Sequence, residues 1–209
     1  MPQKRAAIGV QMHSGWGVLV AVAFCEKKVE VADRRRIVVV DPAMPGGNQL
    51  YHHARLLLDQ QSLAEAERYL DEYAATCEQI ATFAMEEAVM ETHSRGYRIV
   101  GAAILRGAGR TLPALPQILA AHPLIHTAEG EFFGRTVRKA CERLNMPVTS
   151  IRRRDLEEQM KVTFGKAAAG LQRSTAALGK QTGPPWTADH KAAALAALTI
   201  LARKAAIPS

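Results

Sequence analysis

Two apolar runs, separated by a short turn, open the chain and constrain its fold more than any other feature. The first covers residues 6–10 and the second covers residues 16–24, with His13, Ser14 and Gly15 between them. Apolar runs of this length around a glycine-containing turn are typical of a β-hairpin. Because almost every residue in both runs is apolar, we expect the strands to be covered on both faces.

The rest of the chain alternates between strand and helix patterns. Further strands are predicted from β-branched and aliphatic residues at 36–40, 98–105 and 148–151. Helices are predicted at 62–94, 116–121, 128–144 and 188–204. Residues 155–178 also carry a helical pattern, which Gly165 and Gly170 interrupt. This order predicts an α/β fold with a mixed five-stranded sheet and helices on both faces.

The longest helical pattern covers about residues 62–95. Ser62 and Glu65 have the spacing of a capping box, and Gly96 is a typical helix stop. Residues 57–92 hold nine Asp or Glu residues against one Arg. We expect this acidic helix to offer a surface for self-association, so a homo-oligomer is one predicted assembly.

Positive charge is concentrated in the second half of the chain. Residues 93–209 hold 18 Lys or Arg residues against seven Asp or Glu residues, within a chain of formal net charge +7. A basic surface of this kind favours nucleic acid as a partner. The alternative is a solvated surface whose charge partners lie on the acidic helix. The candidate phosphate contacts, in a glycine-containing basic segment at about 152–185, are Arg152, Arg153, Arg154, Lys161, Lys166, Arg173 and Lys180.

Cysteine usage and hydropathy bear on the compartment. The three cysteines are far apart in sequence and form no CxxC pair, which is typical of a reduced, cytoplasmic protein. The chain has no uninterrupted apolar run of about 18 residues, so we expect no membrane span. The basic start resembles a signal peptide, but Gln11 and His13 interrupt its apolar stretch.

Three stretches of the chain carry a resemblance to a known fold family. They are the opening hairpin at residues 8–18, the strand at 98–105 with the helix at 128–144, and residues 184–189 with the Ala-rich helix behind them. In this order they resemble the ribonuclease H-like superfamily, and most closely its RuvC-type Holliday-junction resolvases. The resemblance covers most of the chain and implies a single ribonuclease H-like domain over residues 1–209.

The resemblance also implies where catalytic carboxylates would lie. The family has one in the first strand, one at the end of the fourth strand and a pair at the last helix. The corresponding positions here hold Gln11, Ala102 or Ala103, Asp189, and Ala192 or Ala193. Two-metal cleavage needs several carboxylates around ions that lie about 3.5–4 Å apart. Asp189 alone would hold at most a loosely bound, hydrated Mg²⁺, so we expect no resident metal or cofactor.

Three functions are compatible with these residues. We favour a catalytically degenerate ribonuclease H-like protein that binds nucleic acid without efficient cleavage and keeps Asp189 as its surviving acidic position. The second is an active metal-dependent nuclease with displaced ligands, drawn from Asp41, Glu129, Glu131 and Asp189. The third is a non-enzymatic scaffold or assembly subunit. The sequence does not decide between DNA and RNA.

Several polar residues also have a purely structural interpretation. Asp189 at the start of a helix is favoured by the helix dipole and by capping, whatever its chemistry. His52 and His53 are adjacent, so on a helix they point about 100° apart and rarely bind one ion together. The remaining histidines that we considered and assigned to no metal site are His13, His93, His122 and His126.

Overall fold

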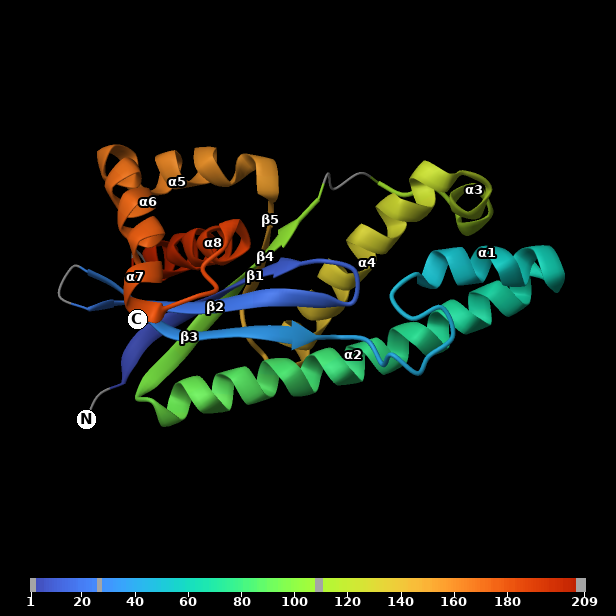
Figure 1. Ribbon diagram of the computed structural model, residues 1–209, viewed down its shortest axis with the longest axis horizontal. Helices are drawn as coiled ribbons and strands as arrows, with labels where there is room; N and C mark the ends of the chain where they lie inside the picture. Colours follow the sequence, from blue (N-terminus) through green and yellow to red (C-terminus); the bar gives the residue numbers. More distant parts are fainter. Residues whose placement is uncertain (1–2, 26–27, 108–110, 206–209) are drawn as a thin grey trace.

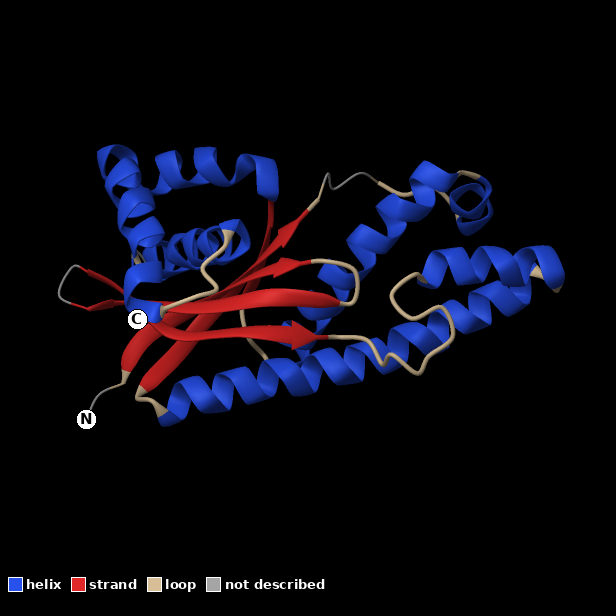
Figure 2. Cartoon of the chain, viewed as in Figure 1, coloured by secondary structure: helices blue, strands red, loops and turns tan. Residues whose placement is uncertain are grey.

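One mixed sheet forms the centre of the computed structural model, which describes residues 3–25, 28–107 and 111–205. Its strands are β1 (Lys4–Met12), β2 (Trp16–Cys25), β3 (Lys28–Val38), β4 (Tyr97–Arg106) and β5 (Val148–Arg152). Their order across the sheet is β3-β2-β1-β4-β5. The first three strands are antiparallel, whereas β4 is parallel to β1 and β5 is parallel to β4. Figure 2 shows this sheet between two sets of helices.

Helices cover both faces of the sheet, as Figure 1 shows. The larger helices are α1 (Leu50–Gln60), α2 (Leu63–Ser94), α4 (His122–Arg143) and α8 (Ala188–Ala205). The shorter ones are α3 (Leu115–Ala120), α5 (Leu156–Phe164), α6 (Ala168–Ala177) and α7 (Gly179–Thr182). Helices α2 and α4 lie against one face, and α8 lies against the other with α5, α6 and α7 around it. The predicted α/β fold with a five-stranded mixed sheet is confirmed.

Strand β1 lies at the centre of the sheet and is buried from both sides. Ala6, Ile8 and Val10 belong to the core under α2 and α4, while Ala7 belongs to the core under α8. This alternation follows from the two-residue period of a strand. Gly9 shares the α8 face, and a Cβ placed on it would lie 1.8 Å from the backbone oxygen of Ala193. The backbone of α8 therefore rests directly on that of β1.

We expect Gly9→Ala to destabilise the protein by about 3 kcal/mol, because neither backbone can move aside for the added methyl group without disturbing the sheet. Gly130→Ala is the matched control, since a Cβ at this position in α4 meets no atom within 4 Å. That change should stabilise the helix by about 0.5–1 kcal/mol. Chemical denaturation of the two variants measures both effects, and equal stabilities would contradict this account of the packing.

The structure differs from the sequence prediction at the start of the third strand, at the segment before α2 and at the start of α4. The third strand starts at Lys28 rather than at residue 36, because the alternating polar residues of an edge strand conceal it from an apolar-run criterion. Helix α1 was not predicted, and its N-cap residue Gln49 makes no side-chain capping bond that could have marked the start. Helix α4 begins at His122 instead of residue 128.

Other helix ends agree with the prediction. The Ser62 hydroxyl accepts a hydrogen bond from the Glu65 amide at 3.2 Å, so it caps α2 as expected. Gly96 follows this helix with a φ of +85°, a conformation that favours glycine. Gly165, at a φ of +52°, separates α5 from the turn before α6. The interruption that we predicted at Gly165 is therefore present, whereas Gly170 lies inside α6 and does not interrupt it.

A helical arm extends beyond the sheet, at the right of Figure 1. We define the arm as α1, the first half of α2, α3 and the first turns of α4. Aromatic contacts stabilise its base, where the rings of Tyr73 and Phe132 are 5.8 Å apart. The Tyr69 hydroxyl donates to the backbone oxygen of Pro45 at 2.6 Å and so fastens the loop before α1 to α2.

All three cysteines are free thiols, and burial raises the pKa of both Cys77 and Cys141 to about 12. Both thiols therefore stay protonated at neutral pH and have low nucleophilicity.

Within the described part of the chain, no helix has the length and apolar character needed to cross a bilayer.

Candidate nucleic-acid interface

The opening hairpin and the closing helix meet at one edge of the sheet. His13, in the turn after β1, places its Nε2 atom 3.0 Å from Oδ2 of Asp189 in the first turn of α8. About a third of each side chain is exposed to solvent. The two segments lie 176 residues apart in sequence, and their contact defines the site. We call this the hairpin–helix edge.

Three flat side chains lie together on the hairpin–helix edge. The rings of His13 and Trp16 stack with centroids 4.4 Å apart and an interplanar angle of 19°. The guanidinium of Arg36, on the neighbouring strand β3, lies 4.2 Å from the centroid of the Trp16 ring. His13 and Arg36 are exposed and Trp16 is partly exposed. Aromatic rings and guanidinium groups are the side chains on which bases stack.

The run of three arginines in β3 divides between the two faces of the sheet. Arg34 donates to the backbone oxygens of Gly183 and Pro185 at 2.7 and 2.8 Å. It therefore holds the loop that leads into α8. Arg35 points to the opposite face and pairs with Asp33 at 2.5 Å. Because strand side chains alternate, Arg34 and Arg36 share the α8 face.

A second histidine secures the start of α8. Nδ1 of His190 accepts a hydrogen bond from the Thr187 amide at 3.2 Å and lies 2.8 Å from the Thr187 hydroxyl. This bonding requires an unprotonated Nδ1. Burial, together with the nearby charge of Arg34, lowers the pKa of His190 below its ordinary value. The position of Asp189 therefore depends on a neutral neighbour.

We expect the protein to lose stability as the pH falls through about 6.5, the pKa of an unperturbed histidine. The unfolded chain then binds a proton at His190 that the folded chain resists, so protonation favours unfolding. The loss levels off below the folded-state pKa. In His190→Asn, where Oδ1 replaces Nδ1 as acceptor, this part of the pH dependence should be absent. Denaturation curves at about pH 7.5 and about pH 5.5 measure the difference, and identical slopes in both proteins would refute the assignment.

The position of the first expected carboxylate is occupied by a carboxamide. Gln11 lies on the α8 face of β1, and its Oε1 atom is buried without a hydrogen-bond partner in the part of the chain that the structure describes. Its neighbour in β4 is Leu105, whereas Ala102 and Ala103 pair with Ile8 and Gly9. All three of these β4 residues are apolar, so none of them offers a metal ligand at this edge.

The last helix contributes a single carboxylate to the same place. Ala192 and Ala193 are buried where α8 packs on the sheet, so the second acidic position of the helix is apolar. Asp189 remains, and His13 engages it. A centre that holds two divalent cations needs several oxygen ligands of negative charge. One paired carboxylate beside one carboxamide does not fit that requirement.

The three displaced ligands of the alternative nuclease each have surroundings of their own. Asp41 accepts a hydrogen bond from the Ala43 amide in the loop after β3. Glu129 bonds to His52 in the arm, and Glu131 lines a hollow with arginines of α4 and β4. Within residues 3–25, 28–107 and 111–205, one group of three or more potential metal ligands lies within 4.8 Å of one another. It consists of histidines in the arm and does not include Asp189.

Three of the seven predicted phosphate contacts pair with nearby acidic residues. Arg152 and Arg154 both pair with Asp155, the latter at 3.5 Å, and Lys161 pairs with Glu157 at 3.0 Å. These pairs are local and partly exposed, so solvent weakens them. None of them involves the acidic helix α2. The alternative of charge partners on that helix is therefore not what the structure shows for these residues.

The other four basic residues have different surroundings. Arg153 donates to the backbone oxygen of Ala188 at 3.4 Å, which places it beside the hairpin–helix edge. Lys166, Arg173 and Lys180 are exposed on the helical layer around α8. No ion pair involves these three side chains among the described residues. They carry positive charge that the described part of the chain does not neutralise.

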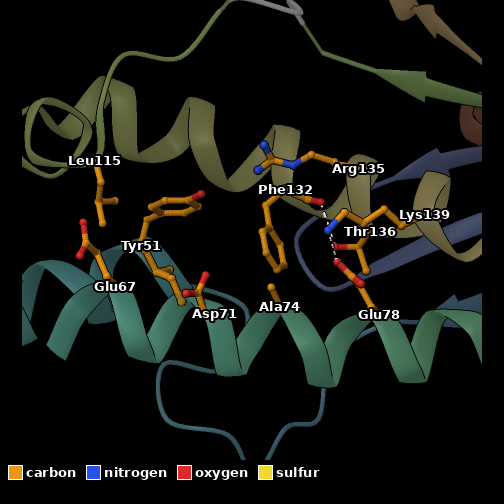
Figure 3. A pocket seen from close by; sticks show the side chains of 11 residues that line it. Tyr51, Glu67, Asp71, Ala74, Glu78, Leu115, Phe132, Arg135, Thr136 and Lys139 are labelled. Atoms are coloured by element: carbon orange, nitrogen blue, oxygen red, sulfur yellow. Dashed lines mark hydrogen bonds and ion pairs between the residues drawn. The ribbon is translucent and has the colours of Figure 1, made fainter. Parts of the chain in front are cut away.

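A separate hollow lies between α2 and α4, with acidic residues on one wall and basic residues on the other (Figure 3). Glu78 of α2 is buried and accepts hydrogen bonds from Lys139 and from Arg143, the latter at 2.7 Å. Part of the acidic charge of α2 is thus balanced inside the chain by α4. Glu67 and Asp71 line the same hollow toward the arm.

The histidine group in the arm is a feature that our sequence interpretation missed. His52, His122 and His126 come together there. We assigned the last two to no metal site, although they stand four apart and therefore share one face of α4. Their spacing was the available signal. The contribution of His52 could not be read from sequence, because α1 was not predicted.

Two solved structures are similar to nearly the whole chain. Thermus thermophilus RuvC in complex with Holliday junction substrate matches 97% of this chain and 97% of its own, with 13% sequence identity and a TM-score of 0.52. A second Thermus thermophilus RuvC structure covers 96% of both chains, with 12% identity and a TM-score of 0.49. No protein-family model and no curated protein matches the chain. The first similarity confirms the predicted ribonuclease H-like fold of RuvC type.

Proposed function

We propose that this protein binds nucleic acid at the hairpin–helix edge and does not cleave it efficiently. The observation that carries the proposal is the set of stacked, exposed side chains, His13, Trp16 and Arg36, beside Asp189. They lie beside Asp189, one of the positions at which the resemblance implies a catalytic carboxylate. The chemistry of the edge is suited to holding bases and phosphates rather than metal ions.

The basic residues extend this surface. Arg153 lies next to the start of α8, and Lys166, Arg173 and Lys180 lie on the helices around it, on the same face of the sheet as Trp16. Lysine and arginine contacts to phosphates provide most of the affinity in binding that is independent of sequence. The similar Thermus thermophilus RuvC was solved with a Holliday junction substrate, which makes a branched DNA the first probe.

The proposed loss of cleavage rests on the ligand set. The resemblance implies two carboxylates where this chain has the neutral carboxamide of Gln11 and an apolar residue of β4, since Ala102, Ala103 and Leu105 all lack a charge. Without their charge, two divalent cations would repel each other and neither would be held in position. Asp189 then serves to orient His13 through their contact at 3.0 Å, and this contact fixes the turn that presents Trp16.

We expect Trp16→Ala to weaken binding of a fluorescent DNA junction by about 1–3 kcal/mol, because a stacked base loses the ring on which it lies.

Replacing Lys166, Arg173 and Lys180 together by Ala should lower the salt dependence of binding. The slope of the logarithm of affinity against the logarithm of salt concentration should fall by about one for each of these side chains that binds a phosphate. Fluorescence anisotropy between about 50 mM and about 200 mM salt measures both effects.

Arg68→Ala is the matched control for charge in this experiment. It removes one positive charge from an exposed position in the first half of α2, on the opposite face of the sheet from α8. Its affinity should equal that of the unaltered protein. Single-stranded DNA and RNA probes decide between the nucleic acids. Absence of binding to every probe at about 50 mM salt would overturn the proposal, since phosphate contacts are strongest there.

We also expect no metal-dependent cleavage. Incubation of the junction, a duplex and a single strand with Mg²⁺ or Mn²⁺ should leave each intact, and Asp189→Asn should behave in the same way. Cleavage that requires the metal and disappears in Asp189→Asn would contradict the proposal. It would favour the alternative of a nuclease with displaced ligands.

Self-association through α2 and a cytoplasmic location remain predictions. Phe83 and Met90, seven residues apart on α2, are 70% and 65% exposed, which leaves an apolar strip among acidic residues. Such a strip is compatible with a partner helix. A scaffold role would combine this strip with the same fold and would need no nucleic acid.

A further inference from the structure

Three imidazole rings converge where α1 lies beside the start of α4 in the arm. His52 comes from α1, and His122 and His126 come from the first two turns of α4. One potential ligand nitrogen of each residue lies within 4.8 Å of the other two. The ring centroids are 4.4 Å apart for the α4 pair, and His52 lies 5.4 and 5.0 Å from them.

We propose that His52, His122 and His126 bind one divalent transition-metal ion of the zinc class. Neutral imidazoles are preferred ligands for zinc, copper, nickel and cobalt, whereas Mg²⁺ and Ca²⁺ prefer oxygen. Three histidines with a fourth position open to water form a recurrent zinc coordination set. The site is distinct from the hairpin–helix edge and does not rest on the proposed function.

Glu129 supplies the outer partner that such a site requires. Its Oε1 atom lies 2.9 Å from Nδ1 of His52 and accepts a second bond from the His52 amide at 3.4 Å. This contact occupies Nδ1 and leaves Nε2 of His52 as the ligand atom. The other carboxylate oxygen of Glu129, Oε2, lies 3.8 Å from Nδ1 of His126. A carboxylate bonded to a metal-binding histidine fixes the tautomer and orients the ring.

The charge of Glu129 gives a second, independent reason for a cation here. This residue is 5% exposed, and within the described chain the basic side chains within 4 Å of its carboxylate are His52 and His126, with no Lys or Arg among them. A buried carboxylate is costly unless positive charge lies nearby. A metal ion bound to neutral histidines supplies that charge at any pH at which the imidazoles are unprotonated.

The geometry needs only a small closure to bind the ion. Zinc–nitrogen bonds of about 2.0–2.1 Å place two tetrahedral ligand atoms about 3.3 Å apart. The ligand atoms of the three histidines now lie within 4.8 Å of one another, so they must approach one another to reach this separation. His122 and His126 are exposed, and rotation of their side chains can bring the rings closer together. A hollow lined by Leu56, Leu119 and Ile125 adjoins the histidines, and a water molecule there would take the fourth position. The bound ion would tie α1 to α4.

Metal titration of the untagged protein tests the proposal. We expect one Co²⁺ per chain, with visible absorption of tetrahedral type that added Zn²⁺ removes. His52→Ala and His126→Ala should each weaken Zn²⁺ binding at least about tenfold, and Glu129→Gln should weaken it about 10–100-fold. Zn²⁺ should raise the melting temperature of the unaltered protein and raise it much less in His126→Ala.

His93→Ala is the matched control, because this exposed histidine lies at the far end of α2 and should leave Zn²⁺ binding unchanged. Circular dichroism without metal verifies that each variant is folded, and His126→Asn serves if the alanine variant is not. Failure of the unaltered protein to bind Co²⁺ or Zn²⁺ would overturn the proposal, as would equal weakening by His93→Ala. Nucleic-acid binding by His126→Ala should be unaffected, so the two proposals fail separately.

Discussion

The close contact between β1 and α8 is the constraint on which the rest of the structure depends. Gly9 has no side chain to hold the helix away, so the backbone of Ala193 rests on the central strand. This contact fixes the height and direction of α8 and brings Asp189 within reach of His13. Arg34 of β3 donates a hydrogen bond to the backbone oxygen of Gly183 and so holds the loop before α8 in place. A site made from the two ends of the chain therefore depends on one missing Cβ.

The parts of the fold that the sequence predicted are those with a local signal. Apolar runs marked β1 and β2, and the Ser62 cap marked the start of α2. The parts that escaped prediction depend on tertiary partners. Strand β3 carries three consecutive arginines because it lies at an edge, and each of their side chains has a partner that is distant in sequence. Strand register likewise decided that Leu105 is the neighbour of Gln11.

The candidate site shows the same division. Asp189 was identified from its place at the start of the last helix, but its partner His13 could be found only once the hairpin and helix were seen together. For the histidines of the arm, the four-residue spacing of His122 and His126 was visible in the sequence. The contribution of His52 could be recognised only from the packing of α1. Contacts between segments are set by packing energy, which no single stretch of sequence encodes.

Helix α2 has a mechanical consequence. Its 32 residues run without interruption from the arm to the far end of the sheet, where Arg95 donates to the backbone of Ala32 in β3. At 1.5 Å per residue, this rod is about 48 Å long. A continuous helix bends little over such a span, so the outer end of the arm is kept at a set distance from the strand ends. Helix α2 therefore sets the distance between the outer end of the arm and the far end of the sheet. A partner that contacts both of these regions must span about the length of α2.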